Sequence, residues 1–456
     1  MSRERPEGPA ADVSERVDGG DGVFLGASTP VALPEGWVED ELVAAGTATS
    51  YRARGELGAD GRYELVEDES AEYRTRIVVR RPPAADFNGT VVVEWLNVSG
   101  GVDAAPDFTY LAEELFRNGF GWVGVSAQLI GVEGGPVAVG VSGSEGIAGV
   151  GLRHLDPARY GDLTQPGDAL SYDILTQVAR AMCLGDTLDG SVPERVLAVG
   201  ESQSAFALVT YANGVQPLTE AFDGFLIHSR AAALAPLGEP GGSIDIAGSI
   251  GGTSTRIRDD LDVPVLVVEA ATDVLSVLNY HAARQEDTDR FRLWEIAGTA
   301  HADRFLVGAR AETLDCAVAI NAGPQRFVVR AALRALGRWV RTGEPPPAVD
   351  RLGVDATPAF VRDADGIVVG GIRTPHVDAP VDVLSGDPGS SGGVVCFLLG
   401  STEPIAQPRL VERHGTADAY LAAFEAATDA AIDAGFVLSE DREAVLADAQ
   451  PERLEG

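Results

Sequence analysis

The stretch RVLAVGESQSAFALVTYAN, residues 195–213, constrains the fold more strongly than any other part of the sequence. A mostly apolar run typical of a buried strand leads into the turn Gly-Glu-Ser-Gln-Ser, and a run typical of a helix follows. The turn places the small hydroxyl residue Ser202 between strand and helix. A nucleophile elbow has this form, because the strained turn exposes the serine and needs small residues two positions before and after it. Gly200 and Ser204 fill these positions, although glycine is usual at the second.

The motif is weak when it is taken alone. An ordinary tight connection between a strand and a helix gives the same pattern. In addition, GVSGS at residues 140–144 has the same spacing, although it lies in a glycine-rich segment and no apolar strand precedes it. A serine hydroxyl also needs an adjacent base to act as a nucleophile at neutral pH. The rest of the sequence must therefore supply partners for Ser202.

Apolar strands alternate with helices through the central part of the chain. Strands that are apolar throughout indicate a mostly parallel sheet covered by helices on both faces. We therefore predict an α/β fold class. The predicted strands are 89–97, 121–128, 195–200, 222–229, 263–270 and 291–298, and the predicted helices are 107–120, 166–183 and 204–213.

Other segments extend this pattern at both ends and interrupt it twice. Residues 47–58 and 71–82 show strand-like alternation and predict an antiparallel pair at a sheet edge. Glycine-rich insertions, at about 129–160 and about 229–262, are of a size that usually walls or covers an active site. A basic amphipathic helix is predicted over 325–343, and a β-like region and two acidic, alanine-rich helices follow it.

Composition divides the chain into a short acidic N-terminal segment and one large domain. Residues 1–22 are acidic and rich in Pro, Gly and Ser, which predicts disorder. Residues 23–456 are predicted to form a single domain, because no internal repeat or long low-complexity linker divides them. Its catalytic core is expected at about 72–310, with a C-terminal extension at about 311–456 packed on the core.

A carboxylate and a histidine follow the last two predicted strands in the chain order that a Ser-Asp-His triad has on this kind of sheet. Asp273 comes after the fifth strand and His301 after the sixth, at the sheet edge where ligands collect in open α/β folds. We predict Ser202 as nucleophile, His301 as general base and Asp273 as the acid that orients the histidine. Glu269, which lies nearer the strand, is the alternative acid.

Two backbone N–H groups are expected to stabilise the oxyanion of a tetrahedral intermediate. One is that of Gln203, at the N-terminus of the helix after the turn, where the helix dipole also favours negative charge. The other is expected in the loop after the strand 89–97, from Leu96 or Asn97. We predict Asn97, for which an Asx turn is the alternative interpretation.

The charge balance excludes some partners. The chain has 69 Asp and Glu against 35 basic residues and no lysine, which gives a net charge of −34. Nucleic acid and anionic membranes are therefore not expected as partners. A GC-rich genome would favour such a composition, but it rarely produces so large a charge. We favour a halophilic protein whose carboxylate surface keeps it soluble in concentrated salt.

Cysteine and histidine usage gives no sign of a disulfide framework, a metal or a cofactor. Cys183, Cys316 and Cys396 are far apart, odd in number and without C-x-x-C spacing. Cys396 is expected to be a small buried apolar residue. The remaining histidines lack metal-ligand spacing. The N-terminal residues contain no apolar signal segment, so we expect a soluble cytoplasmic protein.

The chain resembles the α/β-hydrolase fold, and more narrowly the microbial group described as alpha/beta hydrolase domain-containing proteins. The resemblance rests on GTVVVEWLN, RYGDLTQPGDALSYDI, GESQSA, RQEDTDRFRLWEIAGTAHAD and GGIRTPHVDAPV. It implies a serine hydrolase with Ser202, Asp273 and His301 as the triad, and it implies no substrate. Because GGIRTPHVDAPV lies beyond the core, the resemblance also assigns the C-terminal extension to the same unit.

The sequence therefore predicts hydrolysis of a small-molecule carboxylic ester through an acyl-enzyme. An acyltransferase with the same triad, or a non-catalytic binding protein on a hydrolase scaffold, is the alternative. The oligomeric state stays open.

Overall fold

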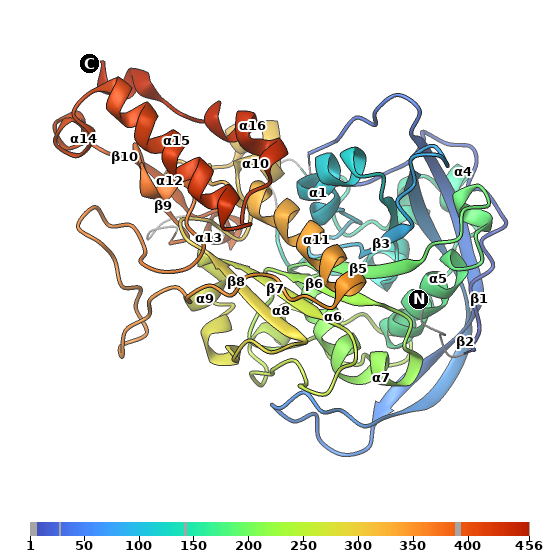
Figure 1. Cartoon of the computed structure of the whole chain (residues 1–456). Coiled ribbons are helices and arrows are strands. Elements are labelled where there is room, and N and C mark those ends of the chain that lie inside the picture. Colours follow the sequence, from blue (N-terminus) through green and yellow to red (C-terminus); the bar gives the residue numbers. More distant parts are fainter. Residues whose placement is uncertain (1–6, 27–28, 141–143, 388–393, 456) are drawn as a thin grey trace.

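The computed structural model describes residues 7–26, 29–140, 144–387 and 394–455 of the chain (Figure 1). Its centre is an eight-stranded sheet in the order β1-β2-β4-β3-β5-β6-β7-β8. The strands from β4 to β8 in this order run parallel, whereas β2 pairs antiparallel with both β1 and β4. The strands are β1 (Val38–Ala53), β2 (Leu65–Arg81), β3 (Thr90–Trp95), β4 (Gly121–Val125), β5 (Arg195–Glu201), β6 (Gly224–His228), β7 (Val265–Ala270) and β8 (Phe291–Ile296). The six predicted buried strands and the antiparallel edge pair are present, which confirms the α/β fold class.

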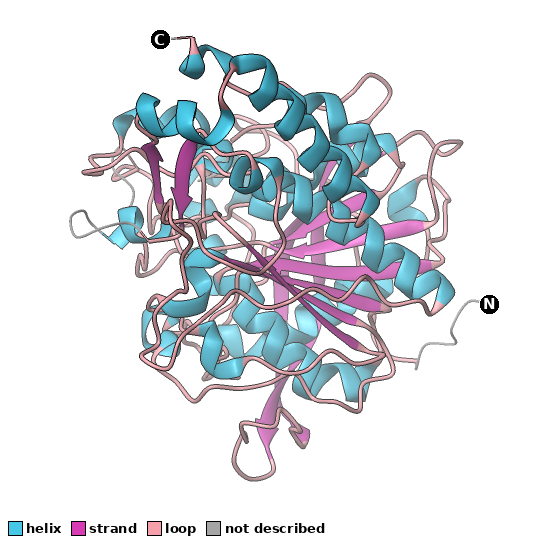
Figure 2. Cartoon of the chain, turned by 60° about the vertical axis from the view of Figure 1, so that its left-hand side comes forward, coloured by secondary structure: helices cyan, strands magenta, loops and turns pink. Residues whose placement is uncertain are grey.

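Helices cover both faces of this sheet (Figure 2). The longer ones next to the sheet are α5 (Ser171–Met182) and α6 (Gln203–Thr210) on one face, and α1 (Pro106–Arg117) and α11 (Gln325–Thr342) on the other. A π-helical turn, η3 (Tyr211–Val215), continues α6. The other α-helices are α2 (Leu129–Glu133), α3 (Leu152–Leu155), α4 (Pro157–Tyr160), α7 (Gln216–Thr219), α8 (Ile246–Ile250), α9 (Ala271–Leu275), α10 (Arg304–Val307), α12 (Pro375–Asp378), α13 (Val394–Leu398), α14 (Gln407–His414), α15 (Ala417–Asp433) and α16 (Arg442–Leu446). The 3-10 turns are η1 (Asp168–Leu170), η2 (Asp186–Leu188), η4 (Tyr280–Ala283), η5 (Gly308–Thr313), η6 (Ser439–Asp441) and η7 (Pro451–Leu454). None of the helices in the described ranges is long and apolar enough to cross a membrane.

The central strand β3 shows why the sheet strands are mostly apolar. Val91, Val93 and Trp95 pack in the hydrophobic cluster that contains α5 and α6. Val92 packs in the cluster on the opposite face, with α1 and α11. Successive side chains of a strand point to opposite faces, so a sheet covered on both sides favours apolar residues at most positions. Glu94 is a buried exception, and its carboxylate accepts hydrogen bonds from Trp122 and from the first N–H groups of α1.

The N-terminal segment is ordered from residue 7, which corrects the predicted disorder of residues 1–22 over the part that the structure describes. Residues 7–22 lie along the outer edge of the sheet, where Asp12 forms an antiparallel bridge with Ala45 of β1. Val17 is buried against this edge. The physical reason is that β1 is an edge strand with unpaired backbone groups, which a polar segment can satisfy without a strongly apolar sequence.

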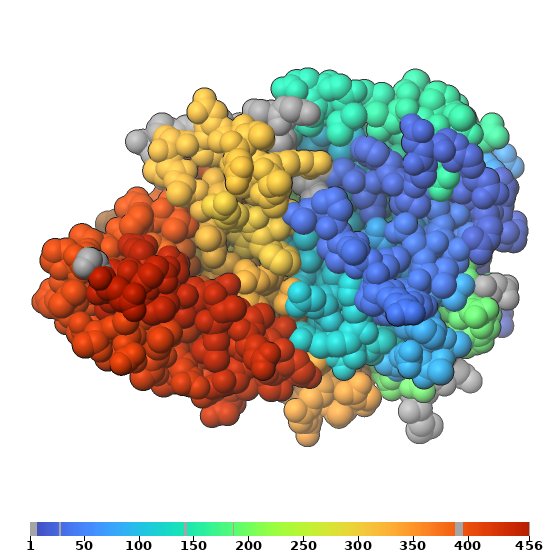
Figure 3. Space-filling model, turned by 90° about the horizontal axis from the view of Figure 1, so that it is seen from above, coloured from blue at the N-terminus to red at the C-terminus, as the bar shows by residue number. Residues whose placement is uncertain are grey.

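The C-terminal extension packs against the core through charged and backbone contacts. Asp441 accepts hydrogen bonds from Arg117 of α1 and Arg330 of α11, at 2.9 and 3.3 Å from the nearest guanidinium nitrogen. Ile372 forms a parallel bridge with Ile296 at the end of β8. A two-stranded sheet, β9 (Asp382–Ser385) with β10 (Ser401–Pro404), lies under α15. Figure 3 shows the last segment of the chain, in red, at one end of the molecule beside the residues in yellow that follow β8.

A disulfide joins Cys316 to Cys396, which corrects the sequence-based expectation of no disulfide. The two cysteines are 80 residues apart in the sequence. They meet only because the segment after η5 and helix α13 lie side by side in the folded chain, and no local spacing reveals such a contact. Cys396 is buried, as predicted, but it is oxidised.

Candidate active site

Ser202 lies on a strained turn between β5 and α6. Its backbone has φ 59° and ψ −124°, a conformation that non-glycine residues rarely adopt. The Ser202 N–H donates to the carbonyl of His228, at 3.0 Å, which fixes the turn to the end of β6. Backbone strain of this kind costs of the order of 1–3 kcal/mol and persists where the surrounding structure enforces it. The turn thus presents the Ser202 hydroxyl at the carboxyl edge of the sheet, as predicted.

The small residues on either side of the turn are sterically required. A Cβ atom on Gly200 would lie 3.0 Å from the Cβ of Ser204 and 3.1 Å from its carbonyl carbon. Ser204, where glycine is usual, fits because its short side chain is fully buried next to this point. A larger residue at either position would force the strand and the helix apart.

His301 lies between Ser202 and Asp273. Its Nε2 atom is 2.8 Å from the hydroxyl oxygen of Ser202, and its Nδ1 atom is 2.7 Å from Oδ1 of Asp273. Asp273 is in the first turn of α9, and its second carboxylate oxygen accepts the N–H of Ala270 at 2.7 Å. His301 is 3% exposed and Asp273 is fully buried. The three side chains that the sequence singled out therefore form one continuous hydrogen-bonded chain.

Glu269, the alternative acid, does not take part in this chain. It is fully buried on β7, and in the described part of the structure neither carboxylate oxygen has a hydrogen-bond partner. Burial and the nearby charge of Asp273 raise its pKa well above the usual range. Glu269 therefore makes no hydrogen bond to His301, whereas Asp273 contacts it directly.

Glu201, which precedes the serine, is a second acidic residue beside His301. Its Oε1 atom lies 3.5 Å from Nε2 of His301. Burial raises the pKa of Glu201 to about 7. Burial alone would lower the pKa of His301, but the charge of Asp273, the hydrogen bond to it and the charge of Glu201 together raise that pKa above its ordinary value. The sequence analysis did not identify Glu201; its position next to Ser202 in GESQS is the signal that could have done so.

Gln203 connects the elbow to the loop after β3. Its side-chain oxygen accepts the N–H of Val98 at 3.2 Å, and its side-chain amide donates to Gln128 at 2.6 Å. Its backbone N–H begins α6, so it has no acceptor within that helix. This leaves the N–H of Gln203 available at the helix N-terminus, beside the Ser202 hydroxyl.

Asn97 lies beside Ser202, but both of its donor groups are engaged elsewhere, which corrects its predicted role as the second oxyanion donor. The backbone N–H donates to Ala104 at 2.9 Å, and Nδ2 donates to the carbonyl of Glu201 at 3.0 Å. Its Oδ1 accepts the N–H of Ser99, which is the Asx turn of the alternative interpretation. Asn97 therefore holds the loop against the elbow.

Gly100, three residues further along the loop, is the candidate that lines the pocket. The N–H groups of Val98, Ser99 and Gly101 donate to Gln203, Asn97 and Val98 respectively. Within the described ranges, the N–H of Gly100 has no protein acceptor, and Gly100 lines the pocket at Ser202. The sequence analysis did not identify this glycine.

A mostly apolar pocket of about 110 Å³ opens onto Ser202 and His301. Segments distant in the sequence form its walls: the first glycine-rich insertion, α10, and the C-terminal extension around α13. The residues that they contribute are Val139, Leu306, Val307, Val395, Leu398 and Leu399. The second insertion does not reach this pocket, but its Ile246 packs behind the loop after β3. Among the described residues, no group of three or more His, Cys, Asp or Glu side chains could hold a metal ion.

The competing motif GVSGS at 140–144 cannot be compared with the elbow, because residues 141–143 lie outside the described residues.

Comparison with known proteins identifies the class. Residues 7–447 match the family described as "Alpha/beta hydrolase domain", so the chain belongs to that family. Its sheet order and elbow are those of an α/β hydrolase. A search of curated proteins finds no match.

Three solved structures illustrate the structural similarity. A fungal esterase from Rhizomucor miehei is 11% identical, with a TM-score of 0.36, and the match covers 69% of this chain and 87% of the esterase. A dienelactone hydrolase from Anabaena variabilis is 16% identical, with a TM-score of 0.30 and coverage of 58% and 93%. An esterase domain from a Rhodothermus marinus protein is 12% identical, with a TM-score of 0.29 and coverage of 66% and 100%.

Proposed function

We propose that the protein is a serine hydrolase that cleaves carboxylic esters through an acyl-enzyme. The observation that carries this proposal is the continuous contact from Ser202 through His301 to Asp273, with Ser202 held on a strained turn. A hydroxyl next to a histidine whose other nitrogen is bound to a buried carboxylate is the arrangement that activates a serine.

Each residue then has a defined part in the reaction. His301 takes the Ser202 proton while the serine oxygen attacks the ester carbonyl, and Asp273 stabilises the imidazolium that forms. The oxyanion receives hydrogen bonds from the N–H groups of Gln203 and Gly100. His301 then donates its proton to the leaving alcohol as the carbon–oxygen bond breaks. A water molecule, deprotonated by His301, attacks the acyl-enzyme and releases the acid and Ser202.

The pocket supports a short, apolar acyl group. Val and Leu supply six of its fifteen lining residues, and its volume of about 110 Å³ is small for a ligand pocket. We therefore expect kcat/KM to fall as the acyl chain of the ester lengthens.

A fluorophosphonate probe tests the proposal directly. It should label wild-type protein at a single serine, found by mass spectrometry of peptides, and should not label Ser202→Ala. A panel of p-nitrophenyl esters from acetate to decanoate, hydrolysed by wild type at low and at multimolar salt, then measures acyl preference and tests the proposed halophilic character. No labelling of folded wild-type protein under either salt condition would favour a non-catalytic binding protein instead.

The pH dependence of hydrolysis is expected to depend on Glu201. Activity needs neutral His301, so kcat/KM should rise with pH through the pKa of His301, which lies above its ordinary value near 6.5. The charge of Glu201 contributes to this elevation. Glu201→Gln removes that charge, lowers the pKa of His301, and should move the acid limb of the profile to lower pH. The measurement is kcat/KM against pH for both proteins.

Glu344→Gln is the matched control for this shift. Its side chain is 63% exposed, and it pairs with Arg338 at the end of α11. Removing this surface charge should leave the acid limb where it is in the wild type. An acid limb that is the same in Glu201→Gln and in wild type would contradict the role given to Glu201.

A further inference from the structure

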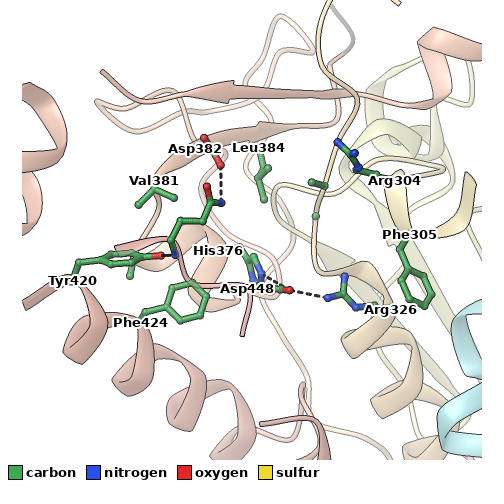
Figure 4. Close-up of a pocket in the computed structure, with 14 residues that line it drawn as sticks. Arg304, Phe305, Arg326, His376, Val381, Asp382, Leu384, Tyr420, Phe424 and Asp448 are labelled. Atoms are coloured by element: carbon green, nitrogen blue, oxygen red, sulfur yellow. Dashed lines mark hydrogen bonds and ion pairs between the residues drawn. The ribbon is translucent and has the colours of Figure 1, made fainter. Parts of the chain in front are cut away.

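A second cavity, of about 380 Å³, lies between the core and the C-terminal extension. It shares no lining residue with the pocket at Ser202. Figure 4 shows Arg304 and Arg326 on one side of it and Val381, Tyr420 and Phe424 on the other. This volume is within the range of sites that bind small molecules.

Short helix α10 separates the two cavities. Arg304 and Phe305 line the second cavity, whereas Leu306 and Val307 line the pocket at Ser202. Asp303 caps this helix by accepting the N–H of Leu306 at 3.0 Å. Substitutions of residues that line only the second cavity can therefore distinguish a ligand bound there from a ligand bound at Ser202.

The two carboxylates of the second cavity are already neutralised by cations. Asp448 accepts a hydrogen bond from Arg326 at 2.8 Å and also contacts Nε2 of His376 at 3.1 Å. Asp382 accepts from Arg453 at 2.8 Å. Neither carboxylate therefore presents an unpaired negative charge to a ligand.

Arg304 is the cation left in excess. Its single ion-pair contact within the described ranges is Glu312, at 3.9 Å, and the two side chains are 61% and 79% exposed. An exposed pair at this distance contributes little. A guanidinium in excess is unusual on a chain with a net charge of −34, and it gives the cavity a local preference for an anion.

Apolar side chains form part of the lining away from Arg304, next to Asp382 and Gln450 (Figure 4). Val381, Leu384 and Phe424 are buried and supply this apolar part. Nδ1 of His376 is buried and has no hydrogen-bond partner among the described residues. A ligand with one charged end and an apolar body would match this lining. Inorganic phosphate would match it less well, because it has no apolar body to lie against these side chains.

We propose that this cavity is a binding site for a small organic carboxylic acid in its monoanionic form. The carboxylate binds Arg304, and the apolar body of the ligand lies against Leu384 and Phe424. The proposal does not depend on the function proposed above, because it requires binding and no reaction.

Benzoate is the probe, measured by isothermal titration calorimetry, and benzamide is its neutral analogue. Because the Arg304 guanidinium is 61% exposed, solvent weakens its contact with a carboxylate, and Arg304→Gln should weaken benzoate binding by about 2- to 5-fold. Benzamide should bind wild type more weakly than benzoate by a similar factor. Ala322→Trp keeps the charges but fills the cavity from its exposed rim, and it should abolish binding.

Arg338→Gln is the matched control, because it removes an equally exposed arginine from the far part of α11 and should bind benzoate as wild type does. Circular dichroism checks that each variant is folded. Wild-type affinity for benzoate in either Arg304→Gln or Ala322→Trp would place the ligand elsewhere, including the pocket at Ser202, and would overturn the proposal. Absence of benzoate binding to wild type at millimolar concentrations would overturn it as well.

Discussion

Asp273→Asn is expected to lower kcat for ester hydrolysis by about 10⁴-fold while the protein stays folded. The backbone N–H of Ala270 donates to one carboxylate oxygen of Asp273, and His301 contacts the other. An asparagine keeps the first contact by turning its oxygen towards Ala270, which turns its NH₂ group towards Nδ1 of His301. Nδ1 must then accept, the proton moves to Nε2, and His301 can no longer take the proton of Ser202. Steady-state hydrolysis of a p-nitrophenyl ester measures the effect.

Glu269→Gln is the control that separates the two candidate acids. Glutamine has nearly the same shape, and the structure gives Glu269 no contact with His301. We expect kcat to change by less than about 10-fold, because the substitution lies near His301 but removes no hydrogen bond to it. Equal losses in Glu269→Gln and Asp273→Asn would show that the orienting acid has been misassigned. Thermal unfolding of both variants excludes loss of the folded state as the cause.

The largest expected effect on stability comes from Arg76→Met, at about 3–5 kcal/mol. Arg76 is fully buried in β2, where its guanidinium contacts Glu41 and Asp103, each at 2.8 Å, and donates to Ser126 at 2.9 Å. Removing the arginine leaves the charge of Asp103 buried without a cation. The free energy of unfolding, from denaturant titration, measures the cost.

Arg52→Met is the matched control on the neighbouring strand β1. Arg52 pairs with Asp68 at 3.3 Å, and its side chain is 62% exposed. Exposed pairs contribute about 0–1 kcal/mol, so this change should alter the free energy of unfolding by no more than that. A destabilisation by Arg76→Met as small as that of Arg52→Met would contradict the importance given to the buried cluster.

The sheet and the contacts among Ser202, His301 and Asp273 could be predicted, because both follow from general rules for the strands of a parallel sheet. A strand buried on both faces is mostly apolar, and runs such as the three valines of β3 made these strands recognisable. Residues that follow parallel strands meet at one edge whatever their separation in the chain. This placed His301 and Asp273 next to Ser202 without any knowledge of the intervening loops.

The second oxyanion donor could not be predicted, because its identity depends on which N–H groups a loop leaves unused. Asn97 is adjacent to the strand and was the natural choice, but the backbone bridge to Ala104 consumes its N–H. That bridge closes a loop of residues with no regular pattern. Gly100 stands out only in the folded chain, because its N–H lacks an acceptor among the described residues and because it lines the pocket at Ser202.

The ordered N-terminal segment and the disulfide escaped prediction for a different reason. Composition reports the average tendency of a segment, and residues 7–22 gain their order from the edge strand that they join. The pairing of Cys316 with Cys396 likewise depends on the folded path of a long extension. Contacts of this kind form between segments that are distant in the sequence, so the local sequence of either segment does not reveal them.

The disulfide has a consequence for how this protein could diversify. Cys396 belongs to α13, and Leu398 and Leu399, which follow it closely, line the pocket at Ser202. The disulfide therefore ties one wall of this pocket to the segment around Cys316, which lies outside the sheet. Substitutions in this wall would change which ligands fit the pocket without altering Ser202, His301 or Asp273. The same tether would make the shape of that wall sensitive to thiol reductants.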